Sequence, residues 1–189
     1  MGSTAGRMHQ RRLRTLAAVT VMIAAGASGE ICGQSVSQHQ LEAAVISKFP
    51  QFVEWPPAAL NNRSTIDLCV AEPDPFGADL DALISNEGVN GRALAVRRVG
   101  RDDNLTACHL LFVSGEAGTT RPAMLQRAAT LPILTISDAP QFLDEGGIIR
   151  LRLVDGRIRF DVNVAIAQRI GLRISSQLLQ LALTVKGPA

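Results

Sequence analysis

Few side chains in this sequence have the type and spacing that catalysis requires. Beyond the first 27 residues the histidines are His39 and His109, and neither is predicted to belong to a ligand-spaced cluster with Cys, Asp or Glu. His109 follows Cys108, but neighbours on a strand point to opposite faces, which argues against a thiolate–imidazole pair. The segment Ser114–Glu116 departs from the G-x-S-x-G turn of hydrolases, and neither G-x-G-x-x-G nor a Walker motif occurs. The sequence therefore predicts no catalytic residue, no metal ion and no cofactor.

Composition excludes two classes of partner. Aromatic residues make up 4% of the 189 residues, with one Trp and no Tyr, so a platform of stacking rings for nucleic acid is not expected. The formal net charge is +2, from 19 Lys and Arg against 17 Asp and Glu. Four of the arginines lie between Arg7 and Arg14, and without them 15 basic side chains face 17 acidic ones, a net charge of −2. Bulk charge therefore attracts the chain neither to DNA nor to an anionic membrane.

The N-terminus has the pattern of a secretory signal peptide. The four arginines precede an apolar run over residues 16–25, and small residues suited to cleavage follow. Because this run is about half of the ~20 residues that a spanning helix needs, a retained membrane anchor is disfavoured. We expect a signal peptide over 1–27, a flexible leader over 28–38 and one domain over 39–187, located in the periplasm.

The rest of the chain alternates between strand and helix patterns. Expected in order are an amphipathic helix over 40–55 broken at Pro50, a strand over 65–71, a helix over 78–85, strands over 93–99 and 108–113, a helix over 122–130, a strand over 133–136 and a helix from Asp138 to Gly146. Repeated units of this length predict a single α/β domain. Its central sheet is expected to be mostly parallel and flanked by helices, with a C-terminal β-hairpin and two C-terminal helices.

The hairpin carries the first candidate site. Asp155-Gly156 is a two-residue type I′ turn signal between strands over 151–154 and 157–160. The turn sets Arg152 opposite Arg159, and like charges directly across a strand pair destabilise it. The arginines on this outer face could therefore bind an anionic ligand or an acidic partner surface, or they form a solvated edge that prevents association. The four residues concerned are Arg150, Arg152, Arg157 and Arg159.

Two helices are expected after the hairpin. Asn163 is a good N-cap for a helix that ends before Gly171, and Ser175 or Ser176 caps the last one. The stretch from Leu178 to Val185 has little polar surface. The last helix is therefore expected to be buried, either deep in the core or against a partner.

Two further positions are candidates for binding a partner or a ligand. Trp55, the only Trp, lies at a helix end beside two prolines, where it is either an interface anchor or a core residue. Asp74 and Phe76 belong to a loop over 74–77 that follows the first strand, at the edge where open α/β sheets take ligands. A tight turn that caps the next helix explains the same loop without a ligand.

Three cysteines in an exported chain favour a disulfide. Cys69 and Cys108 lie in strand-like runs and are the preferred pair, closing a loop of about 40 residues worth roughly 4 kcal/mol. Two buried free thiols are the alternative. Cys69 lies late in its strand and Cys108 early in its own, so parallel neighbours in simple register would not bring them together. Whether Cys32 remains in the mature chain or pairs is left open.

An ordered set of short motifs resembles the YfiR-like family of periplasmic proteins. The matching pieces are FVEWP over 52–56, LCV with Cys69, DPFG over 74–77, NGR over 90–92, Cys108, LPILTISD over 131–138, GRIRFDVN over 156–163 and GLRISSQLLQLA over 171–182. The resemblance implies a small exported α/β protein, often dimeric, that restrains an inner-membrane diguanylate cyclase from the periplasmic side. Such regulation lowers cyclic di-GMP and biofilm formation.

The same resemblance implies a disulfide that Cys69 and Cys108 match. Some relatives carry a second cysteine pair near the hairpin, where this chain has Leu143 and Arg150. The runner-up interpretation is a periplasmic small-molecule-sensing module that acts on a histidine kinase or another membrane partner, with a cleft near residues 74–77. Neither interpretation involves nucleic acid or direct insertion into a membrane.

Overall fold

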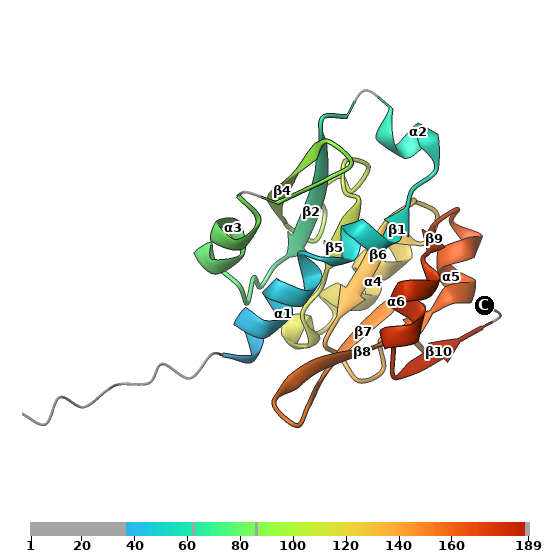
Figure 1. Cartoon of the computed structure of the whole chain (residues 1–189). Helices are drawn as coiled ribbons and strands as arrows, with labels where there is room; N and C mark the ends of the chain where they lie inside the picture. The colour runs from blue at the N-terminus through green and yellow to red at the C-terminus, as the bar shows by residue number, and fades with distance from the viewer. Residues whose placement is uncertain (1–36, 62, 86, 188–189) are drawn as a thin grey trace, which may run out of the picture. The chain divides into compact units, whose positions relative to one another are not determined.

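An eight-stranded sheet lies at the centre of the computed structural model, which describes residues 37–61, 63–85 and 87–187 (Figure 1). The strand order is β10-β8-β7-β6-β5-β2-β4-β3, and every pairing is parallel except β7–β8 and β3–β4. The strands are β2 (Thr65–Ala71), β3 (Gly88–Val89), β4 (Arg92–Val99), β5 (Leu110–Phe112), β6 (Leu134–Ser137), β7 (Ile149–Val154), β8 (Arg157–Asn163) and β10 (Thr184–Lys186). The expected α/β fold with a mostly parallel sheet is confirmed.

Helices pack against both faces of this sheet. They are α1 (Gln38–Ile46), α2 (Pro57–Leu60), α3 (Ala78–Ile84), α4 (Thr120–Ala128), α5 (Val164–Arg169) and α6 (Ser176–Leu181). Side chains of the central strands alternate between two clusters. Leu68 and Phe112 join residues of α1, α3, α5 and α6, whereas Cys69 and Leu111 join residues of α4. In the described part of the chain, none of these helices is long and apolar enough to span a membrane.

The helix expected over 40–55 is shorter than predicted. Ser37 caps α1 in a reciprocal capping box with Gln40, and α1 ends at Ile46. Pro50 accounts for the end, because a proline ring clashes with the carbonyl four residues earlier. The chain continues as a 3-10 turn, η1 (Phe49–Phe52), and as β1 (Val53–Glu54), which pairs with β9 (Arg173–Ile174). The predicted signal peptide, and the leader as far as residue 36, lie outside the described residues.

Cys69 and Cys108 form a disulfide, with their Cα atoms 5.7 Å apart. Strand register alone would not allow it, because Cys69 lies opposite Leu111 on β5. The expected strand over 108–113 is shorter in the structure, and Cys108 lies in a turn before β5. In this turn the Cys108 N–H donates to the Leu105 carbonyl at 2.9 Å. This turn folds over the sheet face that carries Cys69, since both cysteines and Leu105 share one buried cluster. The irregular entry into β5 thus resolves the register problem.

The hairpin has the predicted register. Arg152 pairs with Arg159, and the turn residues Asp155-Gly156 have φ values of +49° and +71°, as a type I′ turn requires. The apolar face is covered only near the base of the hairpin, where Phe160 is buried, while Leu153 is 47% exposed. The tip of the hairpin therefore extends beyond the core.

Residues 138–146 are all described by the structure, and they do not form the expected helix. Successive turns replace it, such as the one in which the Phe142 N–H donates to the Ala139 carbonyl at 3.1 Å. Pro140 would occupy the second helical position, so a capping aspartate loses one of the two amides that it normally binds. Asp138 instead accepts a hydrogen bond from the Gly115 N–H at 2.6 Å.

The predicted deep burial of the last helix within the core is wrong. Ser175 caps α6, which ends at Leu181, and the following residues form β10 beside β8. Leu178 is buried, but Leu181 is 58% exposed, and Leu183 and Val185 are exposed as well. One side of this segment is therefore left for solvent or for a partner.

His109 is a buried residue that holds the segment around α2 against the sheet. Its Nδ1 accepts a hydrogen bond from the Asp67 N–H at 3.0 Å, and its Nε2 lies 3.2 Å from the Ala59 carbonyl oxygen. A neutral imidazole with the proton on Nε2 satisfies both contacts. Burial lowers the pKa of His109, because the charged form would lose its solvation. The Asp67 carboxylate, 3.7 Å from Nδ1, therefore forms no ion pair with the neutral ring.

Acidification should destabilise the fold through His109. Because its pKa in the folded chain lies below the ordinary value of 6.5, the unfolded chain takes up a proton that the folded chain does not. Stability should fall as the pH falls through about 6.5 and should level off below the folded pKa. We expect urea unfolding of the wild type to show a steeper loss than His109→Gln between about pH 7.5 and about pH 5.5. Parallel pH profiles for the two proteins would contradict the assignment.

Candidate functional site

The arginine-bearing face of the hairpin has a buried part and an exposed part. Asp161 is 0% exposed, and its Oδ2 accepts a hydrogen bond from Arg150 Nε at 2.9 Å. Arg152 Nη1 lies 3.7 Å from the same oxygen, so one carboxylate offsets two of the like charges. Arg150 also donates to the Pro140 carbonyl at 2.6 Å. Arg150 was predicted as a binding residue, but these contacts engage it in the structure of the hairpin base.

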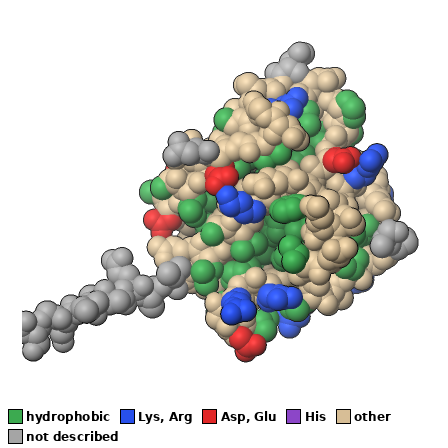
Figure 2. Space-filling model, viewed as in Figure 1, with side chains coloured by type: hydrophobic (Ala, Val, Ile, Leu, Met, Phe, Trp, Pro, Cys, Tyr) green, Lys and Arg blue, Asp and Glu red, His purple; other side chains and the backbone are tan. Residues whose placement is uncertain are grey.

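Arg157 and Arg159 remain exposed. With Val154, Asp155 and Leu183 they line a shallow hollow of about 430 Å³. The Leu183 N–H donates to the Phe160 carbonyl at 2.8 Å, which holds the C-terminal segment against β8. Figure 2 shows Lys and Arg side chains gathered over the hairpin, next to an area of hydrophobic side chains. We call the exposed residues Arg152, Arg157, Arg159 and Leu183 the hairpin surface.

Trp55 does not present its ring as an interface anchor. Its side chain is 7% exposed, and the indole Nε1 donates to the His109 carbonyl at 3.3 Å. The indole also lies edge-on to the His109 ring, with 6.1 Å between the ring centroids. Of the two interpretations drawn from the sequence, the structure agrees with the one in which Trp55 is a core residue. Trp55 also lines a hollow of about 260 Å³ together with Glu54 and Arg92.

The loop over residues 74–77 is a turn that begins α3. Asp74 Oδ1 accepts hydrogen bonds from the Phe76 N–H at 2.8 Å and the Gly77 N–H at 3.3 Å, while Asp74 Oδ2 pairs with Arg98 Nε at 3.0 Å. Phe76 is buried against Phe112, with ring centroids 4.6 Å apart. Both predicted ligand residues are therefore engaged in the turn and the core, as the alternative without a ligand requires.

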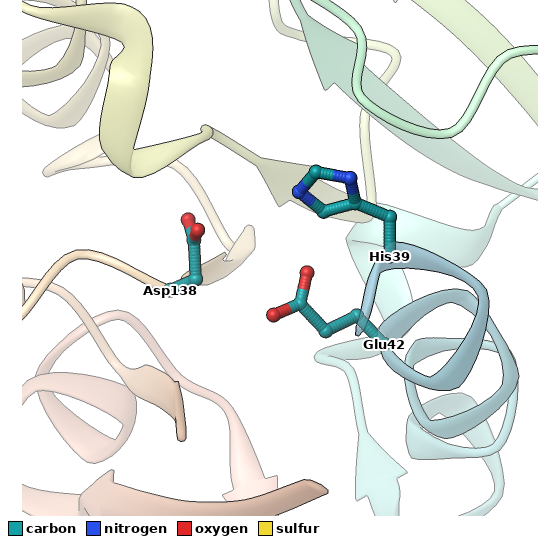
Figure 3. A group of neighbouring side chains, drawn as sticks. All are labelled: His39, Glu42 and Asp138. Atoms are coloured by element: carbon teal, nitrogen blue, oxygen red, sulfur yellow. The ribbon is translucent and has the colours of Figure 1, made fainter. Parts of the chain in front are cut away.

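The structure also brings together three side chains that we did not group from the sequence. His39 and Glu42 on α1, and Asp138 directly after β6, place one ligand-type atom each within 4.8 Å of one another (Figure 3). The expectation that His39 belongs to no ligand-spaced cluster is therefore wrong. The available signal was the spacing of His39 and Glu42, because residues three apart share one face of a helix. Asp138 could be added only once the fold was known.

Comparison with known proteins places these residues in a family. A family model described as YfiR/HmsC-like matches residues 39–183. The chain belongs to the YfiR/HmsC-like family. The match includes the bonded cysteines, the whole hairpin surface, and the cluster of His39, Glu42 and Asp138. Every candidate site residue described above therefore lies within the YfiR/HmsC-like part of the chain.

A solved structure shares the fold. The crystal structure of a conserved domain protein from Vibrio cholerae O1 biovar El Tor strain N16961 resembles this YfiR/HmsC-like chain with a TM-score of 0.51 and 12% sequence identity. The likeness covers 79% of this chain and 60% of that one, so this chain spans about three fifths of the length of the Vibrio protein. At this identity the likeness shows the α/β fold alone.

Proposed function

We propose that this protein is exported to the periplasm, binds the periplasmic region of an inner-membrane diguanylate cyclase and holds the cyclase inactive. The observation that carries the proposal is the YfiR/HmsC-like match over residues 39–183. The ordered motifs of the sequence support the same regulatory role.

The hairpin surface is the docking site that we propose. Arg157 and Arg159 offer guanidinium groups to an acidic partner, and the exposed side chain of Leu183 adds apolar area beside them. Arginine combined with apolar side chains is typical of protein interfaces. A homodimer is a further proposal, which the exposed Leu181 at the end of α6 supports, since a second copy would cover it.

Deletion of the gene should raise intracellular cyclic di-GMP, and a plasmid copy of the wild type should return it to the level of the parent strain. A copy that carries Arg157→Glu and Arg159→Glu should fail to restore it, because the reversed charges repel an acidic partner. The matched control is Arg97→Glu with Arg101→Glu, two exposed arginines on and after β4, far along the sheet from the hairpin. Immunoblots of periplasmic extracts should show equal amounts of all three proteins.

Two outcomes would count against these proposals. Unchanged cyclic di-GMP in the deletion strain under several growth conditions would rule out repression of a cyclase. Full restoration by the Arg157/Arg159 variant would leave repression in place but remove the hairpin surface as the docking site.

A small-molecule-sensing module that acts on a histidine kinase or another membrane partner is the second candidate. The hollow of about 260 Å³ lined by Glu54, Trp55 and Arg92 supports it, because an aromatic wall with one acidic and one basic side chain suits a small polar ligand. The loop over 74–77, where we first expected the ligand, offers no such argument. Unchanged cyclic di-GMP would favour this candidate.

A further inference from the structure

We propose that His39, Glu42 and Asp138 form a binding site for one zinc ion, which ties α1 to the loop that follows β6. This inference is independent of the proposed function. It rests on the placement of three ligand-type side chains, on a buried carboxylate oxygen that has no partner among the described residues, and on the contacts that hold the ligands from behind.

The geometry is close to that of a zinc site. His39 and Glu42 project from one face of α1, and Asp138 faces them from the carboxyl end of β6 (Figure 3). The three ligand atoms lie within 4.8 Å of one another. Zinc with ligands at about 2.1 Å in tetrahedral geometry holds neighbouring ligand atoms about 3.4 Å apart. Small side-chain rotations that bring the three atoms together by up to about 1.4 Å would therefore complete the site.

Glu42 provides the independent observation that a cation belongs here. Its side chain is 0% exposed, and its Oε2 has no hydrogen-bond partner in the described part of the chain. A buried carboxylate oxygen without a partner is costly. One ligand-type oxygen of Asp138 lies within 4.8 Å of one of Glu42, which brings two like charges together. A bound cation would satisfy the free oxygen and relieve the repulsion between the two carboxylates.

The other oxygen of each carboxylate, Glu42 Oε1 and Asp138 Oδ1, accepts a hydrogen bond and need not bind the ion. Gln38 Nε2 donates to Glu42 Oε1 at 2.8 Å, and the Gly115 N–H donates to Asp138 Oδ1 at 2.6 Å. The His39 ring lies edge-on to Phe76, with 6.4 Å between the ring centroids. Outer contacts of this kind orient metal ligands and strengthen binding by about 10- to 100-fold.

In the part of the chain that the structure describes, no basic side chain takes the place of the ion. Within the described residues, no Lys or Arg nitrogen lies within 4.0 Å of the Glu42 or Asp138 carboxylates. Arg150 and Arg152 line the same hollow as Asp138, a space of about 260 Å³, but both guanidinium groups lie against Asp161, Arg150 by a hydrogen bond and Arg152 at 3.7 Å. This hollow gives an ion a route to Asp138 and leaves room for a water molecule as the fourth ligand.

One imidazole nitrogen with two carboxylate oxygens is a ligand set that zinc accepts, and three protein ligands leave one position open. Magnesium and calcium are disfavoured, because they prefer six or more oxygen ligands. The ion would fix the start of the domain against β6. Because two of the three ligands lie on α1, this anchor is expected to change the stability of the N-terminal helix most.

The test is zinc titration of the purified exported chain after treatment with EDTA and dialysis, in a Cys32→Ser background that removes the third thiol. We expect calorimetry to give one zinc equivalent. Excess zinc, at about a hundred times the dissociation constant, should raise the melting temperature by about 5 to 10 °C. Cobalt in place of zinc should show the intense visible absorption of a tetrahedral site.

Variants of the three ligands separate this site from zinc bound elsewhere. His39→Ala, Glu42→Gln and Asp138→Asn should each weaken zinc binding by at least about 10-fold, whereas the exposed Asp102→Asn control should bind as the wild type does. Metal-free Glu42→Gln should melt at or above the wild-type temperature, which shows that the fold survives the change. Wild-type protein without zinc binding would overturn the proposal, and so would ligand variants with unchanged affinity.

Discussion

Replacing Cys69 and Cys108 together with alanine should lower the free energy of unfolding by about 4 kcal/mol. The two residues are bonded and lie 39 positions apart in the chain. Without the bond the unfolded chain gains the conformational entropy of that whole loop, whereas the folded state gains no comparable entropy. For a domain of this size the melting temperature should fall by about 10 °C, which differential scanning calorimetry would measure.

Cys32→Ser is the matched control, since it removes a thiol without touching the bond. It should leave the melting temperature unchanged, while reductant should lower that of the wild type towards the value of the double variant. Equal melting temperatures for the wild type and the Cys69/Cys108 variant would mean that the bond does not form in the exported protein.

Signals that act over a few residues predicted the elements that they govern. Asp155-Gly156 gave the hairpin register because a type I′ turn needs positive φ at both positions. The mostly apolar run over 65–71 matched β2 because a central parallel strand is buried on both faces. Asn163 and Ser175 cap α5 and α6 as expected, since a cap depends only on the next amides of its own helix.

Features set by distant contacts could not be predicted in the same way. Asp138 is a residue type that caps helices, but Gly115 lies close enough in space to take its Oδ1. Trp55 would suit an interface equally well, and its burial depends on core neighbours and on the His109 carbonyl, which are distant in the sequence. Cys108 needed an irregular turn to reach its partner. The zinc candidate could not be predicted for the same reason, because Asp138 comes close to α1 only through the arrangement of the strands in the folded sheet.

Replacing Arg150 with methionine should destabilise the domain by about 3 to 5 kcal/mol. Asp161 lies in the core with its Oδ2 bound to Arg150, and its Oδ1 has no partner within the described residues. Loss of the guanidinium leaves a buried charge with only the more distant Arg152 to offset it, and the low dielectric of the core makes that charge expensive. Urea denaturation of the purified variant would measure the loss.

Arg152 provides the matched control, because it approaches the same carboxylate from a greater distance. Its Nη1 lies 3.7 Å from Asp161 Oδ2 and its side chain is about half exposed, so Arg152→Met should cost less than about 1 kcal/mol. Similar losses for the two variants would show that Asp161 is reached by water and does not depend on Arg150.

The double variant Arg150→Met with Asp161→Leu identifies the cause of the loss. Apolar side chains that replace a buried ion pair together are often neutral, so the double variant should recover most of the stability of the wild type. A double variant as unstable as Arg150→Met alone would mean that packing of the arginine stem, not the orphaned carboxylate, sets the cost. The distinction bears on docking, because Arg157 and Arg159 lie on the same strand as Asp161. If Arg150 stabilises the hairpin and they do not, charge reversal at Arg157 and Arg159 reports on a partner rather than on folding.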